Sequence, residues 1–412
     1  MNSQHHTSVP GSNVPGPNRR SFLRTLGLGA GLALAGGGAA AALSACGTSG
    51  KKNTGKNGAL KPVNFGWWGG TCEAPLFAAY HQGFFDREGL KVNLVNLGQA
   101  SAKDALASGK VDAAPGITFE WLKPIEQGQN IRVTGGIHGG CLRLVAGSKT
   151  GITTLAGLRG KTIGTDKIGG SAHSFFSVVL AAAGIDPQKD VTFVAFPGAQ
   201  LSTAIQHGEI VAAAASDPFP FLIVADGDGV ELASNLTGAY QDHFCCALGV
   251  NGAFLDESPA TAAALTRGLL SAAGWIGNNI DRTAKIEVDN KYVAIDAAVS
   301  AKLLSTYTWK PSVLRLKDNL DQYAREFKTT GILDKGTDPA DLSKRAFRDV
   351  TGGDTGIDPT DPKAPSGSTP SGSTPANASP ATVPRTDTYV LTAAQRDQLL
   401  THACHLSADH SI

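Results

Sequence analysis

An internal repeat constrains the fold of this chain more than any other feature of its sequence. Residues 92–114, VNLVNLGQASAKDALASGKVDAA, align without a gap on residues 191–213, VTFVAFPGAQLSTAIQHGEIVAA. Each copy has a strand-like run, a turn, an amphipathic helical stretch, a glycine next to a charged residue and a second strand-like run. Convergence between unrelated α/β sequences accounts for part of this similarity, but the absence of gaps favours two similar lobes.

Between residues 61 and 351 strand-like runs alternate with helical patterns, which predicts the α/β class with parallel strands. The run 63–66 predicts a first strand, and residues 74–88 predict a helix that ends at Gly89. After residue 251 the strand patterns stop. Helical segments follow at 259–279, 281–292, 296–304, 312–327 and 341–347.

This order predicts an inserted lobe. We expect residues 61–143 to begin lobe one, residues 144–248 to form lobe two, and residues 249–351 to return and complete lobe one with helices. The length of the folded part is sufficient for two structural units with a sizeable core.

The first 46 residues predict an export signal. Arg19 and Arg20 begin the twin-arginine pattern RRSFLR, and a weakly apolar, glycine-rich run follows at 26–43. The run ends in LSAC, a lipobox pattern in which Cys46 is acylated. A transmembrane anchor is the alternative, but the glycine content and the lipobox disfavour it. We therefore expect twin-arginine export and a lipid anchor at the outer side of the cell membrane.

Two segments lack the composition of a packed domain. Residues 47–60 are rich in glycine, lysine and asparagine and predict a flexible spacer. Residues 352–412 are rich in proline, serine, threonine and glycine, and the pentapeptide SGSTP occurs twice in succession at 366–375. Such a tail cannot bury enough apolar surface to offset its chain entropy, so we expect disorder, with a short helix at 392–406.

Composition excludes some classes of function. The net charge is +1 and lysines and arginines form no run, which disfavours nucleic-acid binding. No nucleophile elbow, zinc-protease motif or phosphate-binding glycine loop is present, and we expect no catalytic residues. Besides Cys46 the chain has five cysteines, an odd number, so at least one thiol has no disulfide partner within the chain.

Several ordered motifs resemble one family of transport proteins. They are FFDREGLKV at 84–92, ASGKVD at 107–112 and ITTLAGLRGKTIG at 152–164, with further similarity near 291–293 and 307–313. Together they resemble the solute-binding proteins of ABC importers of the nitrate, taurine and aliphatic-sulfonate type, which also includes binders of pyrimidine precursors. The matching segments are spread over residues 62–351.

The resemblance implies a two-lobed, type II periplasmic-binding-protein clamshell. Two hinge strands, at 141–147 and 244–251, are then expected to connect the lobes, and the solute binds in the cleft between them. It also implies a monomer without cofactor that delivers its solute to a membrane permease and the permease's ATPase. Closure of such a hinge depends on a higher affinity of the closed state for the ligand.

Ligands of open α/β sheets bind beyond the carboxyl ends of the strands, and this rule selects the candidate site residues. The candidates are Trp67, Trp68, Gly70, Thr71, Cys72, Thr118, His138, Cys141, Gly169, Gly170, Ser171 and Asp217. Structural roles compete with ligand contact for several of them. We expect at least one of the two tryptophans to face the cleft, and a core position is the alternative for one of them. Ser171, Thr118 and Asp217 all occupy positions suited to helix caps. His173 is more typical of a helix surface than of a site.

The cysteines near the expected hinge have three interpretations. Cys141 lies in one hinge strand and Cys245 and Cys246 lie in the other, so a disulfide across the hinge is compatible with an exported protein. Buried unpaired thiols are an equal alternative. A metal or covalent-ligand site with His138 and His243 is the third, although the spacings match no standard zinc motif and we expect no metal.

Helix starts rich in glycine favour a small organic anion, such as a sulfonate, nitrate or a taurine-like zwitterion. Arg143 adds a positive charge near the hinge, whereas Glu73 and Glu120 favour an ammonium group. Two other functions use the same fold. One is an exported ligand sensor without a permease, and the other is a pyrimidine-synthase-like enzyme, against which export and lipidation argue.

Overall fold

The computed structural model describes residues 60–98 and 101–363. All described residues belong to one compact unit. The export signal with Cys46, the spacer up to residue 59, the SGSTP repeat and the helix expected at 392–406 lie outside the described residues. Among the helices of residues 60–98 and 101–363, none combines the length and apolarity needed to cross a membrane.

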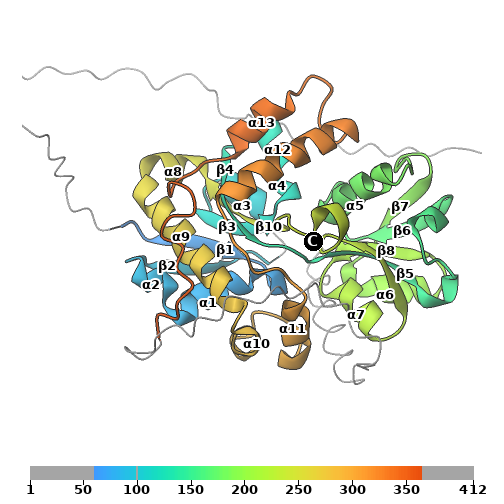
Figure 1. Cartoon of the computed structure of the whole chain (residues 1–412), viewed down its shortest axis with the longest axis horizontal. Coiled ribbons are helices and arrows are strands. Elements are labelled where there is room, and N and C mark those ends of the chain that lie inside the picture. Colours follow the sequence, from blue (N-terminus) through green and yellow to red (C-terminus); the bar gives the residue numbers. More distant parts are fainter. Residues whose placement is uncertain (1–59, 99–100, 364–412) are drawn as a thin grey trace, which may run out of the picture. The chain divides into compact units, whose positions relative to one another are not determined.

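Two five-stranded mixed sheets organise the described residues (Figure 1). The first has the order β2-β1-β3-β10-β4. Its strands are β1 (Val63–Trp67), β2 (Val92–Asn96), β3 (Ala113–Ile117), β4 (Ile131–His138) and β10 (Cys246–Asn251). The second has the order β7-β6-β8-β5-β9. Its strands are β5 (Leu142–Gly147), β6 (Lys161–Thr165), β7 (Val191–Ala195), β8 (Ala212–Ser216) and β9 (Gly229–Ser234). We call the first sheet with its helices the first lobe and the second sheet with its helices the second lobe.

The repeat detected in the sequence is a structural repeat. In the first lobe β2 leads through α3 (Ala102–Ala107) to β3, and in the second β7 leads through α6 (Leu201–Gln206) to β8. In both sheets the strand that follows the lobe entry, β1 or β6, lies between these two and pairs with each of them in parallel. The gapless alignment therefore corresponds to one shared supersecondary unit.

The expectation of purely parallel sheets was wrong. Strand β10 pairs antiparallel with β3 and β4, and β5 pairs antiparallel with β8 and β9. These four antiparallel pairings arise because each lobe receives one strand from the part of the chain that crosses between lobes. Strands β4 and β9 were not predicted, and both pair with such a crossing strand at a sheet edge.

Each expected hinge strand belongs to a single sheet. The chain passes from β4 to β5 through residues 139–141, and it returns from β9 to β10 through residues 235–245. Leu142 and Arg143 pair within the second sheet, whereas residues 246–248 pair within the first, so the crossings differ by a few residues from the expected lobe boundaries.

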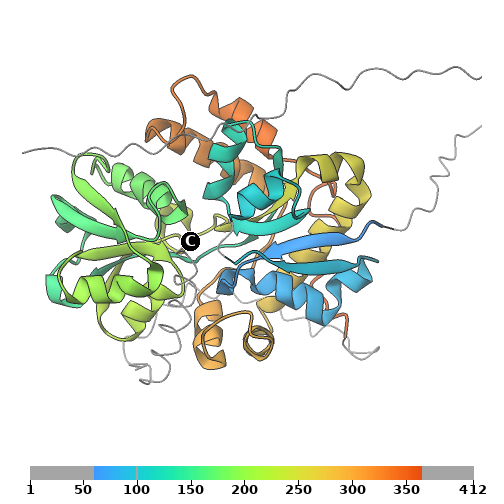
Figure 2. The ribbon, with the colours of Figure 1, turned by 180° about the vertical axis from the view of Figure 1, so that it is seen from behind.

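Strand β8 shows how a sheet of small residues is buried on both faces. Ala212 and Ala214 face the cluster that contains Phe175 and Phe176 of α5 (Ser171–Ala182). Ala213 and Ala215 face a separate cluster from α6 and α7 (Phe219–Ala225). Figure 2 shows α5 on one side of this sheet and the other two helices on the opposite side. The sequence of a strand that is buried on both faces is an unbroken run of apolar residues.

The remaining α-helices and the 3-10 helix η1 belong to the first lobe. The short helices near its first strands are η1 (Thr71–Glu73), α1 (Ala74–Gln82), α2 (Phe84–Arg87) and α4 (Phe119–Glu126). The C-terminal helices are α8 (Gly252–Glu257), α9 (Pro259–Ile276), α10 (Ile280–Asp289), α11 (Ala297–Ser305), α12 (Leu314–Thr329) and α13 (Pro339–Ala346). The five helical segments expected after residue 251 are confirmed, and α8 was not predicted. The helix expected at 74–88 is interrupted at Gly83, whose φ of 85° ends α1.

Residues 352–363, which were expected to belong to a disordered tail, are part of the described structure. Residues 352–363 lie against the first lobe, where Asp354 accepts hydrogen bonds from the Ser312 hydroxyl and the Val313 N–H. Asp358 pairs with Arg87, and Asp361 pairs with Arg282. The prediction of disorder rested on composition alone. Composition does not show that these carboxylates contact the start of a helix and two arginines.

Candidate functional site

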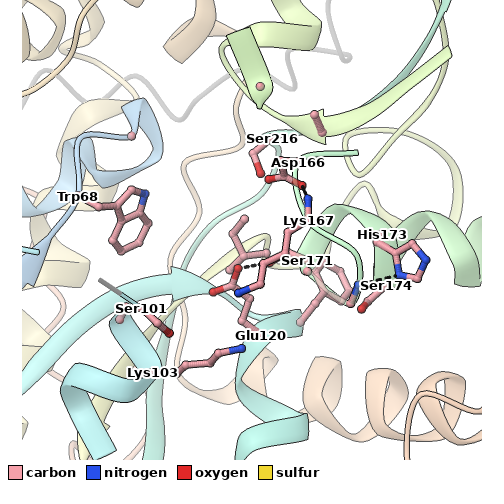
Figure 3. A pocket seen from close by; sticks show the side chains of 18 of the residues that line it. Trp68, Ser101, Lys103, Glu120, Asp166, Lys167, Ser171, His173, Ser174 and Ser216 are labelled. Atoms are coloured by element: carbon pink, nitrogen blue, oxygen red, sulfur yellow. Dashed lines mark hydrogen bonds between the residues drawn. The ribbon is translucent and has the colours of Figure 1, made fainter. Parts of the chain in front are cut away.

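A pocket of about 830 Å³ is lined by residues of both lobes (Figure 3). The loops at the carboxyl ends of β1, β3, β6 and β8 supply much of its lining, as the strand-end rule predicts. Of the candidate residues, those that line it are Trp68, Gly70, Thr71, Gly169, Gly170, Ser171 and Asp217. The candidates outside the lining are Trp67, Cys72, Thr118, His138 and Cys141.

The loop after β1 is held by Glu73. Its buried carboxylate accepts the N–H groups of Trp68, Gly69 and Gly70 at 2.7–3.1 Å. Burial raises the pKa of Glu73 well above its usual range, and the nearby Cys72 adds to this effect. Because its oxygens are used by the backbone of this loop, Glu73 is not placed to bind an ammonium group of a solute.

The two tryptophans of this loop separate. Trp67 makes edge contacts with Phe77 and Tyr292, whose rings stack 3.9 Å apart, and it packs against the core of the first lobe. Trp68 lines the pocket and presents its indole there (Figure 3). An aromatic wall of this kind suits an apolar or planar part of a small molecule.

In the second lobe the pocket meets the N-terminus of α5. Gly170 precedes its first turn, and Ser171, His173 and Ser174 of that turn line the pocket. The first N–H groups of a helix have no intrahelical acceptors, and the helix dipole favours a negative charge there. His173 is part of the lining, contrary to the expectation of a helix-surface role, and its ring Nδ1 accepts the Gly169 N–H at 3.3 Å. Burial lowers the pKa of His173.

A direct contact joins the lobes across the pocket. The Ser171 hydroxyl donates to the Glu120 carboxylate at the start of α4 (Figure 3). Burial raises the pKa of Glu120, although the Ser171 hydroxyl and Lys103 act in the opposite direction. Ser171 thus contributes through its hydroxyl and not as a side-chain cap of α5, which has none.

Asp217 forms a buried ion pair with Arg143. The Arg143 Nε lies 3.0 Å from Asp217 Oδ1, and Tyr307 donates to Asp217 Oδ2 at 3.2 Å. Arg143 also donates to Glu231 at 2.6 Å and to the Thr306 hydroxyl at 2.8 Å. Asp217 was weighed as a helix cap, but the N-terminal cap position of α7 is Pro218. Since Thr306 and Tyr307 belong to the first lobe, this network also spans the two lobes.

Thr118 occupies the N-terminal cap position of α4 but makes no side-chain cap bond. Its hydroxyl is buried and has no hydrogen-bond partner among the described residues. Its neighbours Ile117 and Phe119 line the pocket, whereas Thr118 does not.

The pocket lining includes three lysines that the sequence analysis did not identify as site residues. They are Lys103 at the start of α3, Lys123 in α4 and Lys167 in the loop after β6. Lys123 is neutralised by Glu126 at 2.6 Å and Asp334 at 2.8 Å. Lys103 and Lys167 come from different lobes. Lys167 stood in a predicted loop, but nothing in the sequence indicated that the α3 start approaches the same space.

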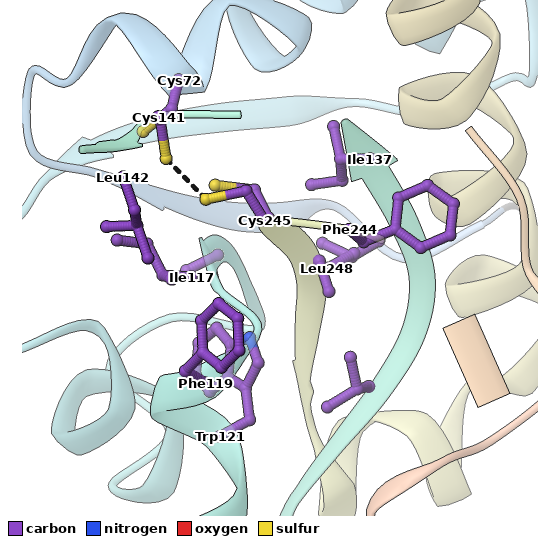
Figure 4. Packing of buried hydrophobic residues seen from close by; sticks show 14 of the residues in the cluster. Cys72, Ile117, Phe119, Trp121, Ile137, Cys141, Leu142, Phe244, Cys245 and Leu248 are labelled. Atoms are coloured by element: carbon purple, nitrogen blue, oxygen red, sulfur yellow. Dashed lines mark hydrogen bonds between the residues drawn. The ribbon is translucent and has the colours of Figure 1, made fainter. Parts of the chain in front are cut away.

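The three cysteines of the expected hinge lie with Cys72 in the core beside the pocket. Cys72, Cys141, Cys245 and Cys246 are all buried free thiols, and the sulfur atoms of Cys141 and Cys245 lie 2.7 Å apart (Figure 4). No disulfide is present between them in this structure. Buried His138 directs Nε2 toward the Cys72 carbonyl at 3.1 Å, and its ring stacks on Tyr307.

The backbone of Cys141 is strained. Its φ is 107°, in the left-handed region that glycine adopts freely and other residues rarely enter. Such a conformation costs about 1–3 kcal/mol and persists only where the surroundings enforce it. The Asp217 N–H, which donates to the Cys141 carbonyl at 2.8 Å, is one such constraint.

Ionisation within the thiol cluster is uneven. Hydrogen bonds from Cys141 and Cys246 hold the pKa of Cys72 well below its usual value. Burial raises the pKa of Cys141 and of Cys246 well above theirs. The pKa of Cys245 is also held well below its usual value, because its burial is outweighed by hydrogen bonds from Cys141 and Cys246.

Solved structures share this fold. The alkanesulfonate-binding protein SsuA of Xanthomonas axonopodis pv. citri, bound to MOPS, superposes with a TM-score of 0.59 at 19% identity, covering 71% of this chain and 100% of that one. The periplasmic nitrate-binding protein NrtA of Synechocystis superposes with a TM-score of 0.59 at 17% identity, covering 70% of this chain and 86% of that one. These similarities confirm the expected periplasmic-binding-protein architecture.

Sequence comparison gives the family. The bicarbonate-binding protein CmpA of Synechococcus elongatus is 28% identical over 131 residues, which cover 30% of this chain and 28% of that protein. The chain therefore matches less than a third of the length of that curated relative. Residues 56–288, more than half of the chain, match the NMT1-like family. The chain belongs to the NMT1-like family.

Proposed function

We propose that this protein is the extracytoplasmic solute-binding receptor of an ABC importer, and that it captures a small oxyanion in the pocket between its lobes. The observation that carries the proposal is the pocket itself, which takes its lining from equivalent strand-end loops of both lobes. A solute that contacts both lobes stabilises the closed state. Closure then follows because the closed state has a higher affinity for the solute than the open state.

The pocket's chemistry supports an anion. The N-terminus of α5 borders it, and Lys103 and Lys167 add positive charge from the two lobes. Trp68 supplies an apolar wall for an organic body. The relatives named above are binders of bicarbonate, nitrate and alkanesulfonate, all small oxyanions, and we extend that class of ligand to this chain.

The remaining parts of the proposal concern its setting. The receptor is a monomer, anchored by an acylated Cys46 after twin-arginine export, and it hands the intact solute to a permease and its ATPase. It binds the solute without altering it. The sequence contains no set of catalytic motifs that would favour an enzyme.

Thermal unfolding with a panel of nitrate, bicarbonate, taurine and alkanesulfonates tests the ligand class, since a ligand that binds only the folded state raises the melting temperature. Lys167→Gln should weaken the best ligand by roughly 10- to 100-fold, because a charge-assisted hydrogen bond contributes about 1.5–3 kcal/mol. Lys149→Gln, an exposed lysine of the same lobe outside the pocket, is the matched control. No shift with any anion would refute the oxyanion assignment.

A further inference from the structure

Three sulfur atoms converge beside the pocket from three separate segments. They are the Sγ atoms of Cys72 in η1, Cys141 in the outward crossing and Cys246 at the start of β10, and all lie within 4.8 Å of one another. Two thiolates bound to one zinc ion in tetrahedral geometry are about 3.8 Å apart, given a bond length of about 2.3 Å. The three sulfur atoms are therefore close enough for one ion to draw them into a shared trithiolate site.

A disulfide does not account for this arrangement. A disulfide between Cys141 and Cys245, the pair in contact at 2.7 Å, leaves Cys72 and Cys246 without a covalent partner. Apolar packing also fails to account for it, because Cys141 keeps a φ of 107° where a third consecutive glycine after Gly139 and Gly140 would be unstrained. A side chain retained at a strained backbone position points to a role for its sulfur.

The surroundings suit a closed structural site. Cys141 and Cys246 are 1% exposed and Cys72 is 8% exposed, so water has little access. The Cys245 sulfur contacts Cys141, and His138 Nε2 lies 3.1 Å from the Cys72 carbonyl oxygen, so both can orient the ligand residues. Thiolate-rich sites of this kind select soft or borderline d¹⁰ cations.

We propose that Cys72, Cys141 and Cys246 bind a thiophilic d¹⁰ cation, Zn²⁺ or Cu⁺, in the core where the chain crosses between the lobes. The ion joins η1, after β1, to the outward crossing and to the start of β10, and so stiffens the connection between the lobes. This site is separate from the solute pocket, since none of the three cysteines lines the pocket. Its test therefore succeeds or fails independently of the transport function.

The experiment uses the purified protein after treatment with a chelator and a reductant. Titration with Co²⁺, a spectroscopic substitute for Zn²⁺, should give thiolate-to-cobalt charge-transfer absorption that saturates at one equivalent and disappears when Zn²⁺ is added. A second titration with Cu⁺ under anaerobic conditions, competed by a chromogenic Cu⁺ chelator, distinguishes the two ions. The ion that binds should also raise the melting temperature of the unsubstituted protein.

Cys72→Ser and Cys246→Ser should each lose the charge-transfer absorption and bind the ion at least about tenfold more weakly. Cys404→Ser, a cysteine outside the described residues, is the matched control and should retain both. If the serine variants do not fold, the stabilisation of the unsubstituted protein still decides the question. The proposal is overturned if neither ion binds or stabilises the reduced protein, if Cys72→Ser and Cys246→Ser bind it unchanged, or if peptide mapping of exported protein shows a quantitative Cys141–Cys245 disulfide.

Discussion

Replacing Asp217 by asparagine tests whether burial or the ion pair with Arg143 has the larger effect on the pKa of Asp217. The side chain of Asp217 is fully buried and that of Arg143 is 4% exposed. Removing a carboxylate from water raises its pKa, whereas a neighbouring guanidinium lowers it. Burial outweighs the attraction of Arg143 and raises the pKa of Asp217 to about 6.

The sign of the resulting pH dependence follows from proton linkage. The unfolded chain has the ordinary aspartate pKa of about 3.9, so the folded protein binds the proton more tightly. The contribution of Asp217 to stability is therefore present at low pH and is lost as pH rises toward and through about 6. A difference of about two pH units corresponds to about 3 kcal/mol, of which about 2 kcal/mol develops between about pH 7.5 and about pH 4.5.

Urea unfolding followed by tryptophan fluorescence measures this contribution. Asp217→Asn cannot titrate, so the free energy of unfolding of the unsubstituted protein minus that of the variant should increase by about 2 kcal/mol from about pH 7.5 to about pH 4.5. Asp318→Asn, on the exposed side of α12, should show no such trend. If the difference instead grows toward high pH, the ion pair with Arg143 dominates and the reasoning from burial is wrong.

Two further predictions concern packing and the segment after α13. Gly116→Ala should lower the free energy of unfolding by about 1–3 kcal/mol, because a Cβ there collides with the Trp121 ring. Gly336→Ala, where a Cβ meets open space, is the control. Equal effects of the two substitutions in urea unfolding would contradict the packing argument. Asp354→Ala should cost about 1 kcal/mol, because it removes the acceptor for the Ser312 hydroxyl and the Val313 N–H at the start of α12. A melting temperature unchanged by Asp354→Ala would show that residues 352–363 add nothing to stability.

Local patterns were sufficient to predict much of the fold. The repeat located both β-α-β units, because the strand period, the helical period and the turn glycines are properties of short segments. The crossing strands could not be oriented in this way. Whether β10 runs parallel or antiparallel to its neighbours depends on the path of the chain between lobes, and no short segment contains that information.

The candidate site was predicted as a set of loops more successfully than as a set of side chains. The strand-end rule placed Trp68, Gly170 and Ser171 at the pocket. It could not separate Trp67, which packs against the core, from Trp68, which lines the pocket, nor show that Asp217 binds Arg143. Side chains such as Lys103 reach the pocket only through tertiary packing, so their role was not visible from sequence spacing.

The crossing segments have a consequence for engineering. Leu142 and Asn235, which begin and end the excursion of the chain into the second lobe, exchange hydrogen bonds: the Leu142 N–H donates to Asn235 Oδ1 at 3.0 Å, and the Asn235 N–H donates to the Leu142 carbonyl at 3.2 Å. The second lobe is thus a cassette whose two ends meet. Such a cassette can be exchanged between relatives, or split for insertion of a fluorescent reporter, with only two adjacent junctions to rebuild.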